Sequence, residues 1–378
     1  MEKKKILVLF GGCSPEYDVS LESAYSVITK IDRAKYQVLT VGITRQGDWY
    51  YFEGDPREIA EDRWQNHAVL TMLSPNRTKG RGLLLPKQGK TELSDGLRTL
   101  AVDVVFPVLH GQNGEDGTVQ GLCALAGLPV VGCSVLASAL GMDKARAHRL
   151  AKAAGVETPE GFVLERTAAG LFDAETGEKQ DRTALADRAG RLGYPLFVKP
   201  VRAGSSFGVT RAEGPWQLQK AIEQALCYDS QVLVEACVPG FETGCAVLGN
   251  ETLFVGEVDE IALAEGFFDY TEKYGLYTSR IYVPARISET QAARIKETAC
   301  RVYRALGCQG FARVDLFLTP EGRVVFHEVN TIPGFTSHSR FPGMLRAAGL
   351  SLEQVLDRAI DLALLQAEQP ERGRADEG

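Results

Sequence analysis

The chain has 378 residues, of which 44% are hydrophobic and 24% are charged, and its formal net charge is −7. A chain of this length exceeds one ordinary hydrophobic core, so we expect a soluble globular protein of two or three domains. The acidic balance disfavours a nucleic-acid-binding surface, which would need a basic patch.

Two further features concern the cellular compartment. No apolar run approaches the ~18 residues that a membrane-spanning helix needs, and the run at 6–10 is too short for a signal-peptide core. The eight cysteines include no C-x-x-C pair and have no histidine at ligand spacing. We therefore predict free thiols in a cytoplasmic protein without a membrane partner.

The N-terminal third has the pattern of an α/β domain. The continuous apolar run ILVLF at 6–10 is typical of a buried parallel strand. After a Gly-rich loop, the spacing predicts a helix at 21–30 and strands at 36–43 and 102–109. Residues 47–94 contain Gly, Pro and charge clusters, so we predict a surface insertion there.

A second unit is expected from Cys133 onward. The segment SALGMDKARAHRLAKAAGV has helical spacing, and GYPLFVKP followed by VRAGSSFGVT predicts a strand, a Gly-rich loop and a second strand. A helix at 215–227 and a strand at 231–238 follow, while 164–191 is expected to hold a loop and part of a helix.

A third unit is expected from Ala236 onward. Its main feature is a hairpin formed by the alternating runs FARVDLFL and RVVFHEVN. Its last helix is predicted at 351–365, and the polar residues 367–378 are expected to form a disordered tail.

Two loops at the ends of N-terminal strands carry polar residues. GGCSPEYDVS places Glu16 and Ser20 at the start of a helix, and it is not a dinucleotide-binding fingerprint. An acid there is usually a cap or dipole partner, but it can also bind a substrate ammonium group. HGQNGEDGT places His110 where ligands collect in open α/β sheets, although such histidines are often structural.

The second unit carries residues suited to a nucleotide. Lys199 ends an apolar strand just before the loop 202–208, in which two glycines bracket two serines and let the backbone approach a phosphate. Lys144 alone is uninformative. Glu235 and Glu242 lie at the end of a strand and could serve an adenine edge and a ribose, although a domain-linking strand is the simpler interpretation.

The hairpin at 310–330 carries the strongest chemical signal. If Glu321 and Gly322 form a two-residue turn, Asp315 faces Glu328 and Arg313 faces Asn330, all on one face. Two facing carboxylates repel each other unless a cation lies between them. Carboxylate and amide oxygens suit Mg²⁺, which commonly arrives with substrate phosphates. The alternative is a solvated hairpin with scattered charges.

These residues together resemble a known family. The order GG-x-S-x-E-x-x-V-S, LHG-x-x-GEDGT-x-QG, MDK, VKP-x-x-x-GSS-x-G, FFDY-x-x-KY, R-x-D and E-x-N-T-x-PG-x-TSHS resembles the D-alanine–D-alanine ligases and their vancomycin-resistance relatives, of the ATP-grasp superfamily. The resemblance covers nearly the whole chain apart from 47–94 and the tail. Tyr17 departs from it, because many relatives carry His or Arg there.

The resemblance implies a mixed α/β, three-domain ATP-grasp fold. Its expected parts are an N-terminal α/β substrate domain at 1–132, a central subdomain at 133–235 and a C-terminal subdomain with the metal hairpin at 236–366. The implied reaction is the ATP-dependent, ADP-forming joining of D-alanine to a second D-amino acid through D-alanyl phosphate, for peptidoglycan synthesis. A mobile lid at 265–280 is expected to exclude water.

The resemblance also implies a role for each site residue. Residues expected to act on the reacting groups are Glu16, Ser205, Tyr274, Arg313 and Gly334. Substrate binding is assigned to His110, Phe268, Ser339 and Arg340. ATP binding is assigned to Lys144, Lys199, Ser206, Glu235, Val238, Glu242 and Lys273. Two Mg²⁺ or Mn²⁺ ions are assigned to Asp315, Glu328 and Asn330.

The second substrate is predicted from two positions. Phe268 and Arg340 resemble the D-alanine–D-serine ligases, of the VanG and VanC types, and not the D-alanine–D-alanine ligases. A guanidinium can hydrogen-bond a serine hydroxyl, and Phe in place of Tyr makes room for it. We expect D-serine to be favoured, with residual D-alanine activity. The alternative is that Arg340 forms a surface salt bridge.

Other functions remain open at this stage. The chain could be a housekeeping D-alanine–D-alanine ligase, an ATP-grasp ligase for another carboxylate and amine, or an inactive nucleotide-binding scaffold. The last is disfavoured because the metal carboxylates and phosphate lysines are present. The resemblance suggests a homodimer that binds only small molecules: D-alanine, D-serine and ATP.

Overall fold

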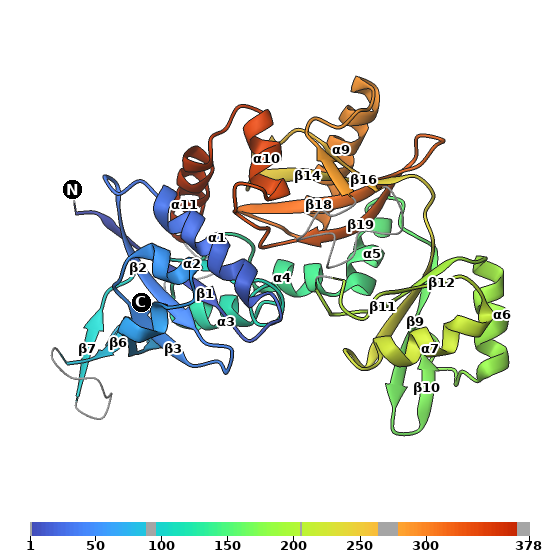
Figure 1. The fold of residues 1–378 in the computed structure, drawn as a ribbon, viewed down its shortest axis with the longest axis horizontal. Coiled ribbons are helices and arrows are strands. Elements are labelled where there is room, and N and C mark those ends of the chain that lie inside the picture. The colour runs from blue at the N-terminus through green and yellow to red at the C-terminus, as the bar shows by residue number, and fades with distance from the viewer. Residues whose placement is uncertain (1, 88–95, 205, 264–278, 369–378) are drawn as a thin grey trace, which may run out of the picture.

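The computed structural model describes residues 2–87, 96–204, 206–263 and 279–368. Within these residues the strands form four sheets of five, five, six and three strands, with helices packed on them (Figure 1). None of the described helices is both long and apolar enough to span a bilayer. All eight cysteines are free thiols. The disordered tail was predicted at 367–378, but residues 367 and 368 belong to the last helix, and 369–378 lie outside the described residues.

The N-terminal sheet has the order β4-β3-β2-β1-β8. The predicted apolar strand is β1, which runs parallel to both of its neighbours. The strands are β1 (Lys4–Gly11), β2 (Tyr36–Ile43), β3 (Trp49–Phe52), β4 (Ala68–Leu70) and β8 (Val104–Val108). The helix after the Gly-rich loop, α1 (Tyr17–Lys30), begins at Tyr17 and not at Leu21, so Glu16 is its N-cap residue.

The prediction of a surface insertion at 47–94 was wrong for its described part, 47–87; residues 88–94 lie outside the described residues. Strands β3 and β4 of the described part extend the N-terminal sheet, and α2 (Pro56–Ala60) and the 3₁₀ helix η1 (Trp64–His67) lie between them. Trp64 is fully buried and packs edge-on against Phe10, with ring centroids 5.1 Å apart. A small separate sheet follows, formed by β5 (Met72–Ser74), β6 (Gly82–Pro86) and β7 (Leu97–Leu100).

The first and last parts of the chain share one core. The helices α1 and α11 (Leu352–Glu368) contact each other, and apolar residues of β1 lie in the same cluster as Phe311, Phe341 and Leu356. Figure 1 shows α11 beside α1 on the N-terminal sheet. Helix α3 (Thr118–Leu125) contributes to a second apolar cluster with β1 and β6. The C-terminal segment is therefore fixed against the N-terminal sheet.

The helical run predicted at 138–156 is two helices. They are α4 (Val135–Met142) and α5 (Lys144–Ala153), and the backbone of Asp143 between them is extended, with φ −89° and ψ 95°. The Asp143 carboxylate accepts a hydrogen bond from the backbone N–H of Arg146 at 2.9 Å, so it caps α5. Lys144 consequently stands at a helix start.

The central sheet is antiparallel, with the order β10-β9-β13-β11-β12. The predicted loop and part of a helix at 164–191 are present as residues 174–181 and α6 (Arg182–Leu192), but the hairpin formed by β9 (Gly161–Thr167) and β10 (Gly170–Asp173) was not predicted. The other strands are β11 (Leu196–Pro200), β12 (Thr210–Ala212) and β13 (Gln231–Ala236). Helices α6 and α7 (Pro215–Ala225) share an apolar cluster with this sheet.

The third sheet has the order β17-β16-β14-β18-β19, with β15 paired to β14. Its strands are β14 (Phe241–Gly249), β15 (Leu253–Val255), β16 (Asp259–Leu263), β17 (Ser279–Tyr282), β18 (Phe311–Leu318) and β19 (Val324–Asn330). Helix α9 (Glu289–Ala305) packs on it together with α4 and α5, and α10 (Arg340–Ala347) contacts β14.

The hairpin of β18 and β19 has the predicted pairing at its polar end. Asp315 pairs with Glu328 and Arg313 pairs with Asn330, whereas Leu318 pairs with Val324 near the turn. The turn is therefore one residue longer than predicted, and a bulge at His327 restores the register. The four polar side chains share one face because these two departures compensate.

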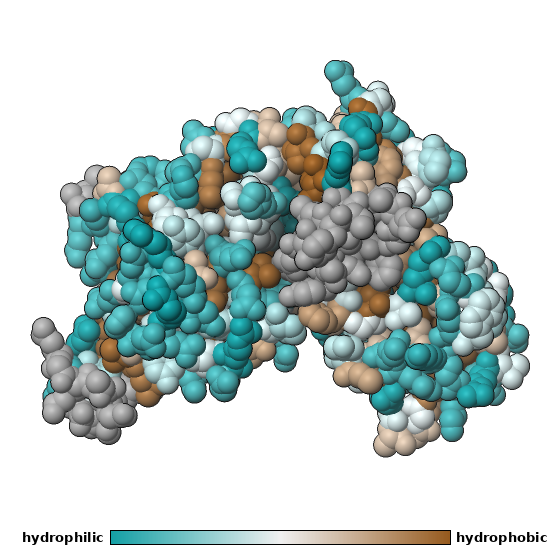
Figure 2. Space-filling model, in the orientation of Figure 1, coloured by the Kyte–Doolittle hydropathy of each residue, from teal (hydrophilic) through white to brown (hydrophobic). Residues whose placement is uncertain are grey.

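The surface agrees with the composition. On the face shown in Figure 2, the surfaces over the N-terminal sheet and over the central sheet are mainly hydrophilic, with hydrophobic residues only in small separate areas. The apolar residues are instead in the internal clusters between sheets and helices.

Candidate active site

Two cavities meet where the three large sheets approach one another. The first has a volume of about 320 Å³ and the second about 430 Å³. Lys144, Ala203 and Glu328 line both. A group passed from a ligand in one cavity to a ligand in the other would therefore pass beside an ammonium group and a carboxylate.

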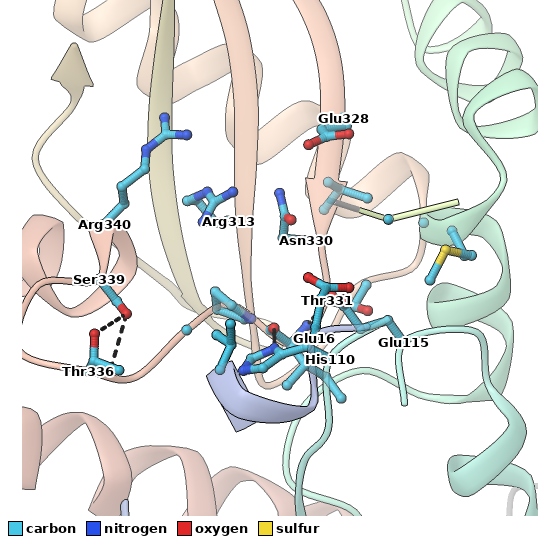
Figure 3. Close-up of a pocket in the computed structure, with 18 of the residues that line it drawn as sticks. Glu16, His110, Glu115, Arg313, Glu328, Asn330, Thr331, Thr336, Ser339 and Arg340 are labelled. Carbon is cyan, nitrogen blue, oxygen red and sulfur yellow. Dashed lines mark hydrogen bonds between the residues drawn. The ribbon is translucent and has the colours of Figure 1, made fainter. Parts of the chain in front are cut away.

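The first cavity brings together residues from distant parts of the sequence. Figure 3 shows Arg313, Glu328 and Asn330 on neighbouring strands, with Glu16, His110 and Glu115 on another wall. The predicted site residues that line it are Glu16, His110, Lys144, Arg313, Glu328, Asn330, Gly334, Ser339 and Arg340.

The second cavity combines apolar walls with charged residues. Phe197, Val238, Phe241 and Phe317 supply apolar surface. The predicted residues that line it are Lys144, Lys199, Ser206, Glu235, Val238, Glu242 and Glu328. The apolar side chains suit the flat ring of a base, and the two lysines, Lys144 and Lys199, suit a polyanion.

A buried ion pair lies at the back of the second cavity. Lys199 Nζ donates a hydrogen bond to Glu235 Oε1, and both side chains are almost fully buried. Burial raises the pKa of the Glu235 carboxyl, but Lys199 outweighs it and holds this pKa below its usual range. Lys144 Nζ donates to the carbonyl oxygen of Ala203 at 2.7 Å, which ties α5 to the Gly-Ser loop.

Asp315 lies behind the cavity wall and is only 1% exposed. It accepts hydrogen bonds from Arg313 Nη2 at 2.7 Å and from Asn330 Nδ2 at 2.8 Å. Burial works to raise the pKa of Asp315, but Arg313 and Arg340 hold it below its usual range. The carboxylate is therefore ionised at neutral pH.

The predicted metal residues suit a divalent cation by their chemistry, and Glu328 and Asn330 line the first cavity, whereas Asp315 is paired with Arg313 and does not line it. Asp315, Glu328 and Asn330 place two carboxylates and an amide on adjoining strand positions, and such hard oxygen donors are the ligands that Mg²⁺ and Mn²⁺ prefer. Among the described residues, no group of three or more His, Cys, Asp or Glu forms a ready metal cluster. The donor set thus consists of two acids and one amide.

Glu16 and His110 are held together by Ser14. Ser14 Oγ accepts a hydrogen bond from the backbone N–H of Glu16 at 3.1 Å and donates one to the carbonyl oxygen of His110 at 2.6 Å. The two loops that the sequence placed at strand ends therefore form one wall.

His110 holds the segment that contains Gly334. Its Nδ1 is 2.9 Å from the carbonyl oxygen of Ile332, so Nδ1 carries the proton, and its Nε2 accepts from Ser23 Oγ at 3.2 Å. Burial lowers the pKa of His110, which favours this neutral form. Because both ring nitrogens have protein partners, His110 supports the site through this segment.

No role was predicted for two residues that support this wall, Ser23 and Glu115. Ser23 Oγ accepts from the backbone N–H of Phe335 at 3.3 Å, and Glu115 accepts from the N–H groups of Gly111 at 2.9 Å and Ile332 at 3.1 Å. Glu115 stands inside the GEDG motif, which was a usable signal. Ser23 lies in a helix, and nothing in its local sequence marks it.

The ionisation of Glu115 should make stability depend on pH. Burial, with a further contribution from Glu16, raises the pKa of Glu115 to about 8. Because this pKa is above its unfolded value, the folded state favours the protonated acid, and its stability contribution is lost as pH rises from about 4.5 towards about 8.

We expect Glu115→Gln to remove this pH dependence. The amide cannot ionise, so the free energy of unfolding of the wild type should fall relative to the variant between pH 5 and pH 8. The loss of one backbone hydrogen bond in the variant would lower its free energy of unfolding by the same amount at every pH. Denaturant unfolding of both proteins across this range measures the difference, and a difference independent of pH would contradict the assignment.

Arg340 is not at the surface, which corrects the alternative of a surface salt bridge. It is 7% exposed, and its Nε and Nη2 donate to both oxygens of Asp259 at 2.7 and 2.9 Å. Nη1 donates to Glu242 Oε1 at 2.9 Å, and Nη2 is 3.4 Å from Asp315 Oδ1. The guanidinium, which lines the first cavity (Figure 3), is therefore paired with Glu242 of the second cavity and lies close to Asp315 of the hairpin.

The loop after β19 completes the first cavity. Ser339 Oγ accepts a hydrogen bond from the backbone N–H of Thr336 at 3.1 Å and lies 2.7 Å from Thr336 Oγ1. A Cβ atom at Gly334 would come within 2.7 Å of Ser339 Oγ, so a larger residue there would displace this hydroxyl from its present position. Four predicted site residues lie outside the described residues: Ser205, Phe268, Lys273 and Tyr274. The predicted lid at 265–280 also lies outside them, except for its last two residues, 279 and 280.

Comparisons with known proteins cover nearly the whole chain. Residues 5–133 match the family model for the D-ala D-ala ligase N-terminus, and residues 160–361 match that for the D-ala D-ala ligase C-terminus. The vancomycin/teicoplanin A-type resistance protein VanA of Enterococcus faecium is 45% identical over 370 residues, covering 96% of this chain and 99% of that protein.

Two further relatives differ in what their names state. A putative D-alanine–D-lactate ligase of Streptomyces coelicolor is also 45% identical, again covering 96% of this chain and 99% of that protein. The crystal structure of the VanG D-Ala:D-Ser ligase from Enterococcus faecalis is 48% identical, with a TM-score of 0.84, and covers 96% of this chain and 100% of that one.

Proposed function

Because the chain belongs to the D-alanine–D-alanine ligase family, we propose that it joins D-alanine to a second D-amino acid, with D-serine favoured. Its mixed α/β architecture is the ATP-grasp fold of that family. The observation that carries the proposal is the meeting of two cavities at Lys144 and Glu328, one suited to a nucleotide and one to amino acids.

We place ATP in the second cavity. Val238 and Phe317 offer surface to the base, Glu235 and Glu242 serve the adenine and ribose, and Lys144 and Lys199 face the phosphates. Lys273 and Ser206 are proposed to complete this site. The two lysines neutralise charge that builds on the phosphoryl group during transfer.

We place the amino acids in the first cavity. Glu16 binds the ammonium group of the first D-alanine, and Ser339 binds the second substrate together with Phe268 and Arg340. His110 holds the Ile332–Phe335 segment, so that the Gly334 N–H and Arg313 stabilise the oxyanion. Each such donor lowers the activation free energy of acyl transfer by about 3 kcal/mol.

The proposed chemistry has two steps. The carboxylate of the first D-alanine attacks the γ-phosphorus of ATP, giving D-alanyl phosphate and ADP. The amine of the second amino acid then attacks the acyl carbon, and inorganic phosphate leaves. Asp315, Glu328 and Asn330 are proposed to hold Mg²⁺ or Mn²⁺, which supplies charge neutralisation at the phosphates when bound.

The remaining expectations join the proposal. Ser205 and Tyr274 are proposed to connect with Glu16, beneath a lid at 265–280. The domain division proposed is 1–132, 133–235 and 236–366, in a cytoplasmic homodimer. A role in vancomycin resistance draws support from VanA and the VanG ligase, whose names state resistance and D-serine ligation.

The test is the release of ADP with different amino acids. We expect turnover with D-alanine alone and a higher kcat/KM for D-serine as the acceptor. Equal or better turnover with D-lactate would place the chain with the relative named for that acceptor. A D-alanine preference would make it a housekeeping ligase. Turnover with L-amino acids and none with D-alanine would contradict the proposal altogether.

A further inference from the structure

Tyr17 occupies an unusual position beside the first cavity. It is the first residue of α1, directly after Glu16, and it is fully buried although it carries a hydroxyl group. Its hydroxyl donates a hydrogen bond to Asp62 Oδ1 at 2.7 Å and accepts one from Trp64 Nε1 at 3.2 Å. Both partners lie in the segment between β3 and β4.

The ring of Tyr17 is also held on its face and edge. The guanidinium carbon of Arg45 lies 3.9 Å above the ring, and Arg45 Nη2 donates to Asp18 Oδ1 at 2.6 Å. A Cβ atom at Gly11 would come within 3.0 Å of Cε2 of the ring. Burial and the bond to Asp62 raise the pKa of Tyr17 to about 12, so its hydroxyl stays a neutral donor.

The partners of Tyr17 are themselves fixed. Trp64 is fully buried against Phe10, and a Cβ atom at Gly42 would come within 2.4 Å of its ring, so this strand position has to be glycine. Asp62 has a left-handed backbone with φ 52°, which Asp and Asn tolerate better than most residues. The hydroxyl of Tyr17 is therefore anchored to a rigid part of the N-terminal sheet.

We propose that Tyr17 is a positioning residue that fixes the direction of the Glu16 carboxylate through its hydroxyl bonds to Asp62 and Trp64. Consecutive residues at a helix start share one backbone orientation, so anchoring the Tyr17 side chain sets the rotation of the first turn of α1. Ser14 Oγ also holds Glu16, by accepting a hydrogen bond from its backbone N–H at 3.1 Å. This inference rests on the proposed role of Glu16 in binding the ammonium group of D-alanine.

The variant Tyr17→Phe tests the hydroxyl group alone. We expect the KM for D-alanine, measured at saturating ATP and D-serine, to rise about tenfold, because small misplacements of binding groups have large effects. The KM for ATP and kcat should change by less than about twofold, since the second cavity is untouched. Asp62→Asn keeps an acceptor and should remain near wild type, whereas Asp62→Gly should reproduce Tyr17→Phe.

A matched control separates positioning from stability. Tyr51 of β3 is also buried, and its hydroxyl donates to Glu53 Oε1 at 2.6 Å, but it has no connection to Glu16 among the contacts of the described residues. Tyr51→Phe should lower the melting temperature to a similar extent without changing the KM for D-alanine. An unchanged KM in Tyr17→Phe, or an equal rise in Tyr51→Phe, would overturn the inference. Wild-type protein without D-alanine turnover would instead overturn the proposed function.

Discussion

Glu328→Gln is expected to abolish turnover while leaving the fold intact. Glu328 lines both cavities and pairs across the hairpin with Asp315, so it stands where phosphoryl transfer is proposed to occur. The substitution keeps the volume of the side chain but removes a negative charge. Loss of a preorganised charge at a transferring group lowers kcat by about 10³-fold or more. Initial rates of ADP release with D-alanine measure the effect.

The hairpin itself should survive because the charge removed from Glu328 repels the buried carboxylate of Asp315. Glu328 works against the lowered pKa of Asp315, so its neutralisation should not destabilise the hairpin. Glu321 provides a matched control, since it lies exposed in the turn of the same hairpin. Glu321→Gln should retain wild-type rates. Activity of Glu328→Gln near the wild-type level would show that the metal assignment is wrong.

The hairpin shows how much local sequence can predict. The alternation of apolar and polar residues set which side chains share a face, and Asp315, Glu328, Arg313 and Asn330 do share one. The turn length was predicted from Glu321 and Gly322 and was wrong by one residue, and no local signal marked the bulge at His327. The polar register was right because a slip of one residue would have moved the polar face into the core.

The failures of the sequence interpretation have a common physical cause. The Gly, Pro and charge clusters of 47–94 predict an insertion because such clusters mark turns, yet the Trp64 ring is buried against the N-terminal sheet. The break between α4 and α5 occurs at Asp143, although the residues on either side, Met142 and Lys144, would suit a continuous helix. These outcomes are decided by tertiary packing, which overrides local propensity.

Contacts between segments that are distant in the sequence could likewise not be predicted from local patterns. Ser23 meets Phe335 across 312 residues of sequence, and Arg340 meets Asp259 across 81. The motifs located the loops that form the site, but they did not show that the 332–335 segment is held by hydrogen bonds from Ser23 of α1 and from His110 and Glu115 of the loop after β8. Only the packing of α1 and α11 in one core brings these segments together.

The largest expected effect on stability concerns Arg340. Arg340→Leu leaves Asp259 and Asp315 buried without this counter-charge, and breaking such a pair typically costs about 3–5 kcal/mol. We expect the free energy of unfolding to fall by about this amount, and activity with D-alanine and D-serine to be lost together. Arg346→Leu, in the exposed part of the same helix, should change stability by less than about 0.5 kcal/mol.

Because Arg340→Leu is expected to remove all activity, the preference for the second substrate has to be tested with the milder variant Arg340→Lys. Three of the N–H groups of Arg340 are bonded to Asp259 and Glu242, which leaves at most two for a substrate hydroxyl. Lysine keeps the charge that the carboxylates require but loses the planar fork. A pocket that bonds a hydroxyl discriminates against analogues that lack it, so the ratio of kcat/KM for D-serine over D-alanine should fall about tenfold or more. An unchanged ratio in a stable Arg340→Lys protein would show that Arg340 is a structural counter-charge and that D-serine is selected elsewhere.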